Sequence, residues 1–174
     1  MTDVLRSVEI GRATVDDAEE LSALAIKTYV HTFGAAFEPD ELAHHLERAI
    51  SVACWREYLA RDRILIARIA GRAIGYVQLG PAKQAGEIEI RRLYVDADFQ
   101  GHGIGSELLR RVLSAPETAA ASAVLIDVWE KNLRARQLYE RFGFWHEGGM
   151  EPFYLKSGEI DGYDIVLVRR RAEP

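Results

Sequence analysis

A run of closely spaced glycines lies between an expected strand and an expected helix, which indicates a fold in which strands and helices alternate. The run is Gln100–Gly105, with the letters QGHGIG, between a strand expected at 87–95 and a helix expected at 103–113. Glycine lets the backbone turn tightly and approach a ligand closely. The first N–H groups of the following helix lie at the positive end of its dipole and have no partners within the helix. The segment therefore predicts a phosphate-binding site made of backbone N–H groups, and we expect its ligand to carry a pyrophosphate.

Three other interpretations of this turn can be weighed from the sequence. A P-loop needs a lysine before its serine, whereas Gly105 is followed directly by Ser106. A dinucleotide-binding turn fits better, because Asp127 follows about 20 residues on, where an acid would bind a ribose. However, Ser106 stands where the third glycine of that motif belongs, and the turn follows a hairpin instead of opening a βαβ unit. A tight turn without any ligand stays open as the third interpretation.

The pattern of apolar residues predicts an α/β fold with a mixed sheet and helices on both of its faces. Hairpins and helical crossovers both occur along the chain, which is typical of such a sheet. No internal repeat or linker interrupts the 174 residues, so we expect a single domain over residues 1–174. The strand at 124–129 is expected to be buried on both faces because it is nearly all apolar. The expected strands are 8–10, 64–70, 73–79 (after a Gly71-Arg72 turn), 87–95, 124–129, 144–155 and 160–168; the expected helices are one between Thr14 and Gly34, 39–50, a short piece ending at Leu59, 103–113 and 133–142.

The strand at 87–95 carries its apolar residues in two phases. Ile88 and Ile90 are even-numbered, whereas Leu93 and Val95 are odd-numbered, so strict alternation would place the two pairs on opposite faces. An extra residue near 91–92 would restore one apolar face by forming a β-bulge. Such a bulge would leave backbone groups able to pair with an amide-bearing ligand, as another strand would. A strand that is partly buried on both faces and has no bulge is the alternative.

Glu89 is a candidate general base on this strand. It would share a face with Glu87, beside the backbone groups that a bulge leaves open. A carboxylate at such a place can take a proton from a ligand directly or through water. Both glutamates are also consistent with ordinary solvated positions on a strand.

Composition argues against several classes of partner. The formal net charge is −5, whereas nucleic-acid-binding surfaces are usually basic. The sequence has one cysteine, and His44 and His45 face different directions on a helix, so we expect no metal site. No apolar stretch reaches the roughly 18 residues that a membrane span needs, and the N-terminus lacks a long apolar region. We therefore expect no nucleic-acid partner, no membrane partner and a cytoplasmic location.

Two blocks of residues together resemble the GNAT superfamily of N-acetyltransferases. The family's central motif reads Arg/Gln-x-x-Gly-x-Gly/Ala after a strand, as Gln100–Gly105 does after Leu93-Tyr94-Val95. The second block is an asparagine that opens a helix ending in Tyr-x-x-x-Gly-Phe, which here is Asn132–Phe144. The resemblance implies a mixed, mostly antiparallel central sheet with helices on both faces. It also implies an enzyme that moves an acetyl group from acetyl-CoA, its co-substrate, to a primary amine by direct attack on the thioester.

The resemblance further implies a role for each residue of these blocks. Backbone groups of Leu93 and Val95 would pair with the pantetheine arm of coenzyme A, with Tyr94 between them in the same site. Asn132 would hydrogen-bond that arm. Tyr139 would protonate the departing thiolate, and Glu89 would act as general base, although the apolar spacing around Tyr139 also suits a plain core residue. The pyrophosphate would be held at the central motif by Gln100, Gly101, His102, Gly103, Ile104, Gly105 and Ser106.

The acceptor side is predicted from aromatic and acidic residues. The expected substrate residues are Tyr29, Phe33, Glu87 and Tyr154. The run Val128–Asn132, together with Thr32-Phe33 and Phe153-Tyr154, resembles bacterial PaiA-type polyamine acetyltransferases. Acidic and aromatic groups suit a small cationic amine through charge pairing and cation–π contact. Acetylation of an amino acid or a protein N-terminus, and a non-catalytic acyl-CoA-binding module, are the alternatives. A homodimer formed through the last strands is left open.

Overall fold

The computed structural model describes residues 3–154 and 160–171, which fall into two compact units. The first unit comprises Met1–Leu79 and Arg92–Val112, and the second comprises Gly80–Arg91 and Leu113–Pro174. Strands β3 (Arg72–Pro81) and β4 (Glu87–Val95) each contribute residues to both units. The single-domain assignment for residues 1–174 stays a prediction.

Strands of the first unit are hydrogen-bonded in the order β1-β2-β3-β4. β1 (Glu9–Arg12) pairs antiparallel with β2 (Arg63–Ile69), which pairs antiparallel with β3. The β2–β3 hairpin turns on Ala70 and Gly71, whose φ angles of 49° and 81° are both positive, as in a type I′ turn. The predicted turn at Gly71-Arg72 was therefore wrong by one residue, because Arg72 already pairs with Ile69 in the ladder.

Helices of the first unit have recognisable start signals. Pro39 occupies the first turn of α3, where its missing N–H costs no helical bond. Ser51 caps α4, because its hydroxyl accepts the N–H of Cys54. The helices are α1 (Asp3–Arg6), α2 (Ala18–Phe33), α3 (Pro39–Ile50), α4 (Val52–Arg61) and α5 (Ile104–Leu113), with 3₁₀ turns η1 (Val15–Asp17), η2 (Gly34–Ala36) and η3 (Ala97–Phe99).

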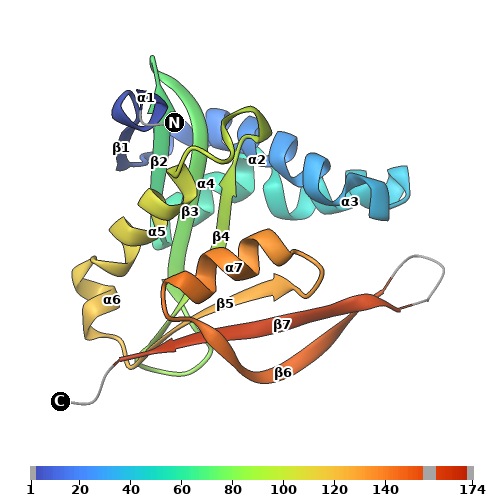
Figure 1. The fold of residues 1–174 in the computed structure, drawn as a ribbon. Coiled ribbons are helices and arrows are strands. Elements are labelled where there is room, and N and C mark those ends of the chain that lie inside the picture. Colours follow the sequence, from blue (N-terminus) through green and yellow to red (C-terminus); the bar gives the residue numbers. More distant parts are fainter. Residues whose placement is uncertain (1–2, 155–159, 172–174) are drawn as a thin grey trace. The chain divides into compact units, whose positions relative to one another are not determined.

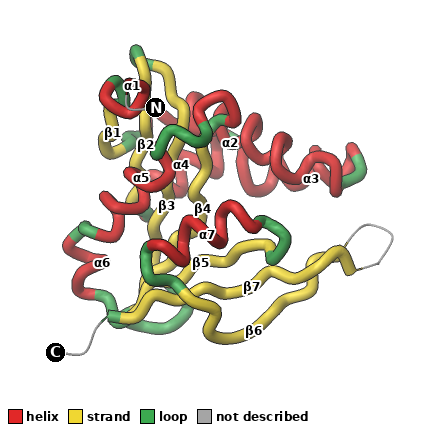
Figure 2. Tube along the Cα trace, viewed as in Figure 1, coloured by secondary structure: helices red, strands yellow, loops and turns green. Residues whose placement is uncertain are grey.

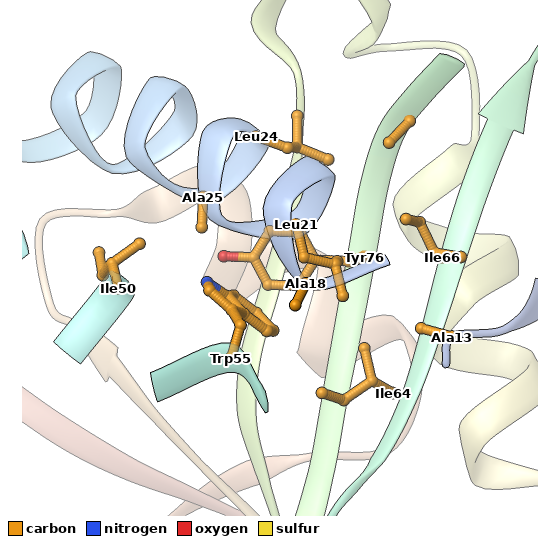
Figure 3. Packing of buried hydrophobic residues seen from close by; sticks show 11 residues of the cluster. Ala13, Ala18, Leu21, Leu24, Ala25, Ile50, Trp55, Ile64, Ile66 and Tyr76 are labelled. Carbon is orange, nitrogen blue, oxygen red and sulfur yellow. The ribbon is translucent and has the colours of Figure 1, made fainter. Parts of the chain in front are cut away.

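The core of the first unit lies between α2, α4 and the strands β2 and β3 (Figure 3). Trp55 of α4 is fully buried and meets Tyr76 of β3 edge-to-face, with ring centroids 5.1 Å apart. Ala18, Leu21 and Ala25 bring one face of α2 onto these rings at helical spacing. The helix expected between Thr14 and Gly34 is therefore present as α2 and packs one face on the core.

Two consecutive residues of β3 show that helices cover both faces of the sheet in this unit. Tyr76 points toward α4, as its contact with Trp55 shows. Gly75 points the other way, because a Cβ built on it would lie 3.4 Å from the side chain of Leu108 in α5. Helices on both faces, as predicted, are thus confirmed for this unit.

Strands of the second unit are hydrogen-bonded in the order β4-β5-β7-β6 (Figure 1). The start of β4 pairs parallel with β5 (Ala123–Trp129), and β7 (Ile160–Arg170) lies antiparallel between β5 and β6 (Trp145–Tyr154). The described ladders are thus mostly antiparallel, as expected. The helices of this unit are α6 (Pro116–Ala120), which the sequence did not predict, and α7 (Leu133–Arg141).

One face of β5 is buried along the strand, whereas the other is fully buried only at Ala123, so the prediction of two buried faces was wrong. Val124, Ile126 and Val128 are buried, whereas Asp127 between them is exposed. The single acid in the apolar run marks a solvent-facing side. Among the helices of residues 3–154 and 160–171, none has the length and apolar character needed to cross a bilayer.

Candidate functional site

The glycine turn in the first unit has the geometry of a phosphate cradle. Gly101 and Gly103 have φ angles of 87° and 85°, which side-chain-bearing residues rarely adopt. The first helical hydrogen bond of α5 runs from the N–H of Glu107 to the carbonyl of Gly103. The N–H groups of residues 104–106 therefore point out of the helix start, where Figure 2 shows the loop after β4 leading into α5.

A buried carboxylate anchors the entry to this turn. The side chain of Asp96 is 1% exposed, and its oxygens lie 2.7 Å from Nζ of Lys27 and 3.2 Å from Nη2 of Arg72. The hydrogen bond to Asp96 raises the pKa of Lys27. Burial by itself would raise the pKa of Asp96, but the bond from Lys27 and the nearby positive charges lower it overall. Sequence reasoning missed this anchor, because only the fold brings Lys27 of α2 to the end of β4.

Two groups of the predicted pantetheine strand, Leu93–Val95, already have partners within the protein. The ring of Tyr94 stacks on Tyr76, with centroids 5.8 Å apart, so this side chain belongs to the core. The carbonyl of Val95 accepts a hydrogen bond of 3.1 Å from the side chain of Gln100. Gln100 thus fixes the end of β4 to the first residue of the motif.

Half-buried aromatic rings gather where α2 meets α3 in the first unit. Tyr29 contacts Phe33, with centroids 4.9 Å apart, as their i, i+4 spacing on α2 allows. His45 stacks on Tyr29 at 4.5 Å, and Phe37 lies about equally far from both, at 6.2 Å. Burial and the charge of Arg92 lower the pKa of His45. The structure therefore brings together two of the three predicted aromatic substrate residues, Tyr29 and Phe33, and adds two rings that the sequence did not reveal.

Arg92 of β4 is held in place by a buried polar chain that sequence reasoning also missed. Its guanidinium donates to Oε1 of Gln78 at 2.6 Å, and Gln78 donates to Oδ2 of Asp62, also at 2.6 Å. Gln78 and Asp62 are both buried. The guanidinium also lies over the ring of Tyr58, 4.8 Å from its centroid. A positive charge is thereby fixed on the side of β4 that faces α4.

In the second unit, Glu89 is ion-paired. Its carboxylate lies 3.1 Å from Nη1 of Arg91, and both side chains are 28% exposed. Glu87 lies near Arg170, whose pKa is raised chiefly by its hydrogen bond with Glu147 and to a smaller extent by the charge of Glu87. Both predicted glutamates therefore have arginine neighbours, and neither is an isolated strand residue.

The described pairing of β4 with β5 covers three residues on each strand. Glu87–Glu89 pair with Ala123–Leu125, and both strands continue beyond this ladder. The register shift described in the sheet of the first unit lies in the β2–β3 pair, between Ala67 and Arg68. The bulge expected near 91–92 stays a prediction.

Asn132 immediately precedes α7, and Tyr139 lies within it. Oδ1 of Asn132 accepts the N–H of Ala135 at 3.1 Å, so the asparagine caps the helix and its amide nitrogen is the part that can donate to a ligand. Tyr139 is 4% exposed and lies edge-on to Phe144. This burial is consistent with both of its predicted roles. Tyr154 is the last residue of β6, and its side chain lies outside the described part of the structure.

Three carboxylates share one face of the second unit's sheet. In the ladders, Asp164 of β7 lies opposite Glu151 of β6 on one side and opposite Trp129 of β5 on the other. Asp127 lies two residues before Trp129 in β5, so its side chain is on the same face. Partial burial and the charge of Glu151 raise the pKa of Asp127; partial burial and the charges of Asp127 and Glu151 raise the pKa of Asp164. The sequence could not reveal this group, because it depends on strand register. No cluster of His, Cys, Asp or Glu suited to a metal ion occurs in the ranges 3–154 and 160–171.

Comparisons with known proteins agree with this arrangement. The sequence profile of the Acetyltransferase (GNAT) family matches residues 24–144. An uncharacterized N-acetyltransferase of Mycobacterium tuberculosis is 33% identical over 155 residues, which cover 88% of this chain and 97% of the relative. N-acetylaspartate synthetase of Danio rerio is 32% identical over 52% of this chain and 32% of its own length. The crystal structure of PaiA N-acetyltransferase from Thermoplasma acidophilum in complex with coenzyme A has a TM-score of 0.79 at 19% identity, covering 95% of this chain and 99% of that one.

Proposed function

The chain belongs to the acetyltransferase (GNAT) family and uses acetyl-CoA as its co-substrate, and on this premise we propose that it acetylates a primary amine of a small, polyamine-like acceptor. The observation that carries the proposal is the carboxylate face formed by Asp127, Glu151 and Asp164. A molecule with two or more ammonium groups can place one at the reacting carbonyl and pair another with such a face. Within the first unit, the half-buried rings of Tyr29 and Phe33 are cation–π surface of the kind that binds amines. Glu87 and Tyr154 complete the proposed substrate residues.

The cofactor residues of this proposal are those of the glycine turn and its neighbours. The N–H groups of residues 101–106 would bind the two phosphates, and the outward direction of those of residues 104–106 at the start of α5 supports this role. Backbone groups of Leu93–Val95 and the amide nitrogen of Asn132 would orient the pantetheine arm. Acetyl-CoA supplies an acetyl group already activated as a thioester, so the protein needs no covalent nucleophile of its own.

Two side chains are assigned to proton transfer. Glu89 takes a proton from the ammonium form of the acceptor, so that the neutral nitrogen can attack the thioester carbonyl. The carbon–sulfur bond then breaks, and Tyr139 gives its phenolic proton to the sulfur, which leaves as a thiol. The acetylated nitrogen loses its second proton, which returns to the phenolate of Tyr139 through solvent, so that the amide and the phenol are both neutral. Arg91 keeps Glu89 in place through their ion pair.

An amino acid is the second candidate acceptor, and Arg92 is the observation that favours it. Its guanidinium is fixed by Gln78 and could receive the α-carboxylate of an amino acid. The relative from Danio rerio, named for the synthesis of N-acetylaspartate, agrees with this alternative. Arg92 and the carboxylate face thus favour acceptors of opposite charge.

A thiol-release assay over a panel of amines separates these candidates. We expect turnover with spermidine and putrescine, and Asp127→Asn should raise KM for both, with kcat affected less. The pKa values of Asp127 and Asp164 are raised, so both carboxyl groups still lose protons at pH values where an ordinary aspartate is already fully ionised. KM for the amine should therefore continue to fall as pH rises through this range. Turnover of aspartate in preference to amines, abolished in Arg92→Gln, would reject the polyamine proposal.

Tyr139→Phe tests the catalytic assignment itself. We expect kcat to fall by about 10²–10⁴-fold, the usual contribution of a positioned proton donor. The affinity for coenzyme A should stay unchanged, because the phenol is assigned no part in binding. Tyr163→Phe, which removes a hydroxyl from β7 of the same unit, serves as the matched control. Equal activity of the two variants would make Tyr139 a core residue.

A further inference from the structure

A pocket of about 250 Å³ lies in the second unit, and none of its lining residues is among the catalytic, cofactor or substrate residues proposed above. Leu113 and Val124 form part of its apolar wall, and the arginines of the range 169–171 form its polar side. Figure 1 shows the end of β7 reaching the foot of α6, where the chain turns into β5. The N–H of Arg171 bonds to the carbonyl of Ser122 at this point, which fixes the three elements together.

The three consecutive arginines are not equivalent. Arg170 pairs in the ladder with Ala123, and its Nε lies 3.0 Å from both carboxylate oxygens of Glu147. Arg169 pairs with Val124, whose side chain lines the pocket, so strand alternation places it on the opposite face from Arg170. Within residues 3–154 and 160–171, neither Arg169 nor Arg171 has a carboxylate partner. Two arginines that have no carboxylate partner among the described residues therefore border a pocket with a partly apolar lining.

Thr118 of α6 supplies an independent sign that the pocket is built for a ligand. It lines the pocket and is 5% exposed, yet its hydroxyl has no hydrogen-bond partner in the described part of the chain. Folded proteins satisfy nearly all of their buried polar groups, because an unmade bond costs free energy. A ligand atom that accepts a hydrogen bond in this pocket would satisfy the hydroxyl.

We propose that this pocket binds a small organic oxyanion, with a phosphate or carboxylate head and a compact apolar body. Arginine forks match both kinds of head group, and the threonine hydroxyl would donate a further bond. The apolar wall would accept a body of about one ring, since pockets for drug-sized ligands usually start near 300 Å³. Such a site is separate from the glycine turn, so it neither requires nor tests the acceptor proposed above.

Calorimetry on the whole chain tests the site. Coenzyme A is added to saturation first, so that the glycine turn is occupied, and phenyl phosphate, benzoate or phenol is then titrated. We expect binding of at least one anion and none of neutral phenol, with the tighter anion identifying the head group. Absence of heat from both anions at millimolar concentration, or equal binding of phenol, would overturn the proposal.

Variants place the binding in this pocket. Thr118→Val and Arg169→Gln should each weaken the anion by about tenfold or more, the effect of losing one bond to a charged group. Arg170→Gln is the matched control and should change the affinity by much less, because its guanidinium is already held by Glu147. Thr118→Val should fold, because it removes only an unsatisfied hydroxyl. If Arg169→Gln proves unstable, Arg171→Gln replaces it, because Arg171 is exposed. Unchanged affinity in Thr118→Val and in the arginine variants would refute the assignment.

Discussion

Gly103→Ala should weaken both the fold and the binding of coenzyme A, by amounts that the structure allows us to separate. A Cβ at this residue would lie 3.6 Å from Cδ2 of Leu5, an ordinary van der Waals contact, so no clash contributes. The cost comes from holding alanine at a φ of 85°, about 1–2 kcal/mol. For a chain of this size, that cost lowers the melting temperature by roughly 2–8 °C.

The same backbone strain should also weaken the binding of coenzyme A. If the turn relaxes toward negative φ, the N–H groups beside Gly103 rotate, and one bond to a phosphate is worth about 1.5–3 kcal/mol. We therefore expect coenzyme A to bind roughly 10- to 100-fold more weakly by calorimetry. Gly11→Ala adds the same methyl group in β1, where no heavy atom lies within 4 Å, and it should change neither quantity. An unchanged affinity in Gly103→Ala would refute the reasoning.

Three further predictions concern neighbouring residues. Gly75→Ala would place a Cβ 3.1 Å from the carbonyl of Tyr94, so we expect a loss of about 1–3 kcal/mol in denaturant unfolding and weaker coenzyme A binding; wild-type behaviour would contradict this. Asp96→Asn should lower the melting temperature by several degrees at pH 7. Because the folded state lowers the pKa of Asp96, the difference in melting temperature between wild type and variant should shrink as pH falls below 3.8. A difference that stays constant with pH would argue against the ion pairs. Glu89→Gln should reduce kcat by about 10²-fold or more with unchanged coenzyme A affinity, and full activity would exclude it as the base.

The glycine turn between β4 and α5 could be predicted from the sequence because its information is local. The closely spaced glycines Gly101 and Gly103 show where the backbone takes positive φ, and the apolar spacing after Ile104 shows where the helix begins. The strand at 87–95 was predicted with its observed bounds for the same reason. The tyrosine of the second block, Tyr139, was correctly placed near the end of a helix.

Features that depend on register or on distant contacts could not be predicted. The carboxylate face requires Asp127, Glu151 and Asp164 to meet across three strands, and alternation within one strand says nothing about its neighbours. The anchor of Lys27 on Asp96 joins residues 69 positions apart. α6 has only five residues, too few for a helical period to show.

Comparative calorimetry of coenzyme A and pantetheine with the unmodified protein tests the central claim most directly, because the two ligands share the arm and differ in the diphosphate nucleotide. If the amides at the start of α5 bind the diphosphate, coenzyme A will bind at least about 100-fold more tightly than pantetheine, because pantetheine lacks two or more of the charge-assisted hydrogen bonds. Equal affinities would mean that the glycine turn contributes nothing to cofactor binding.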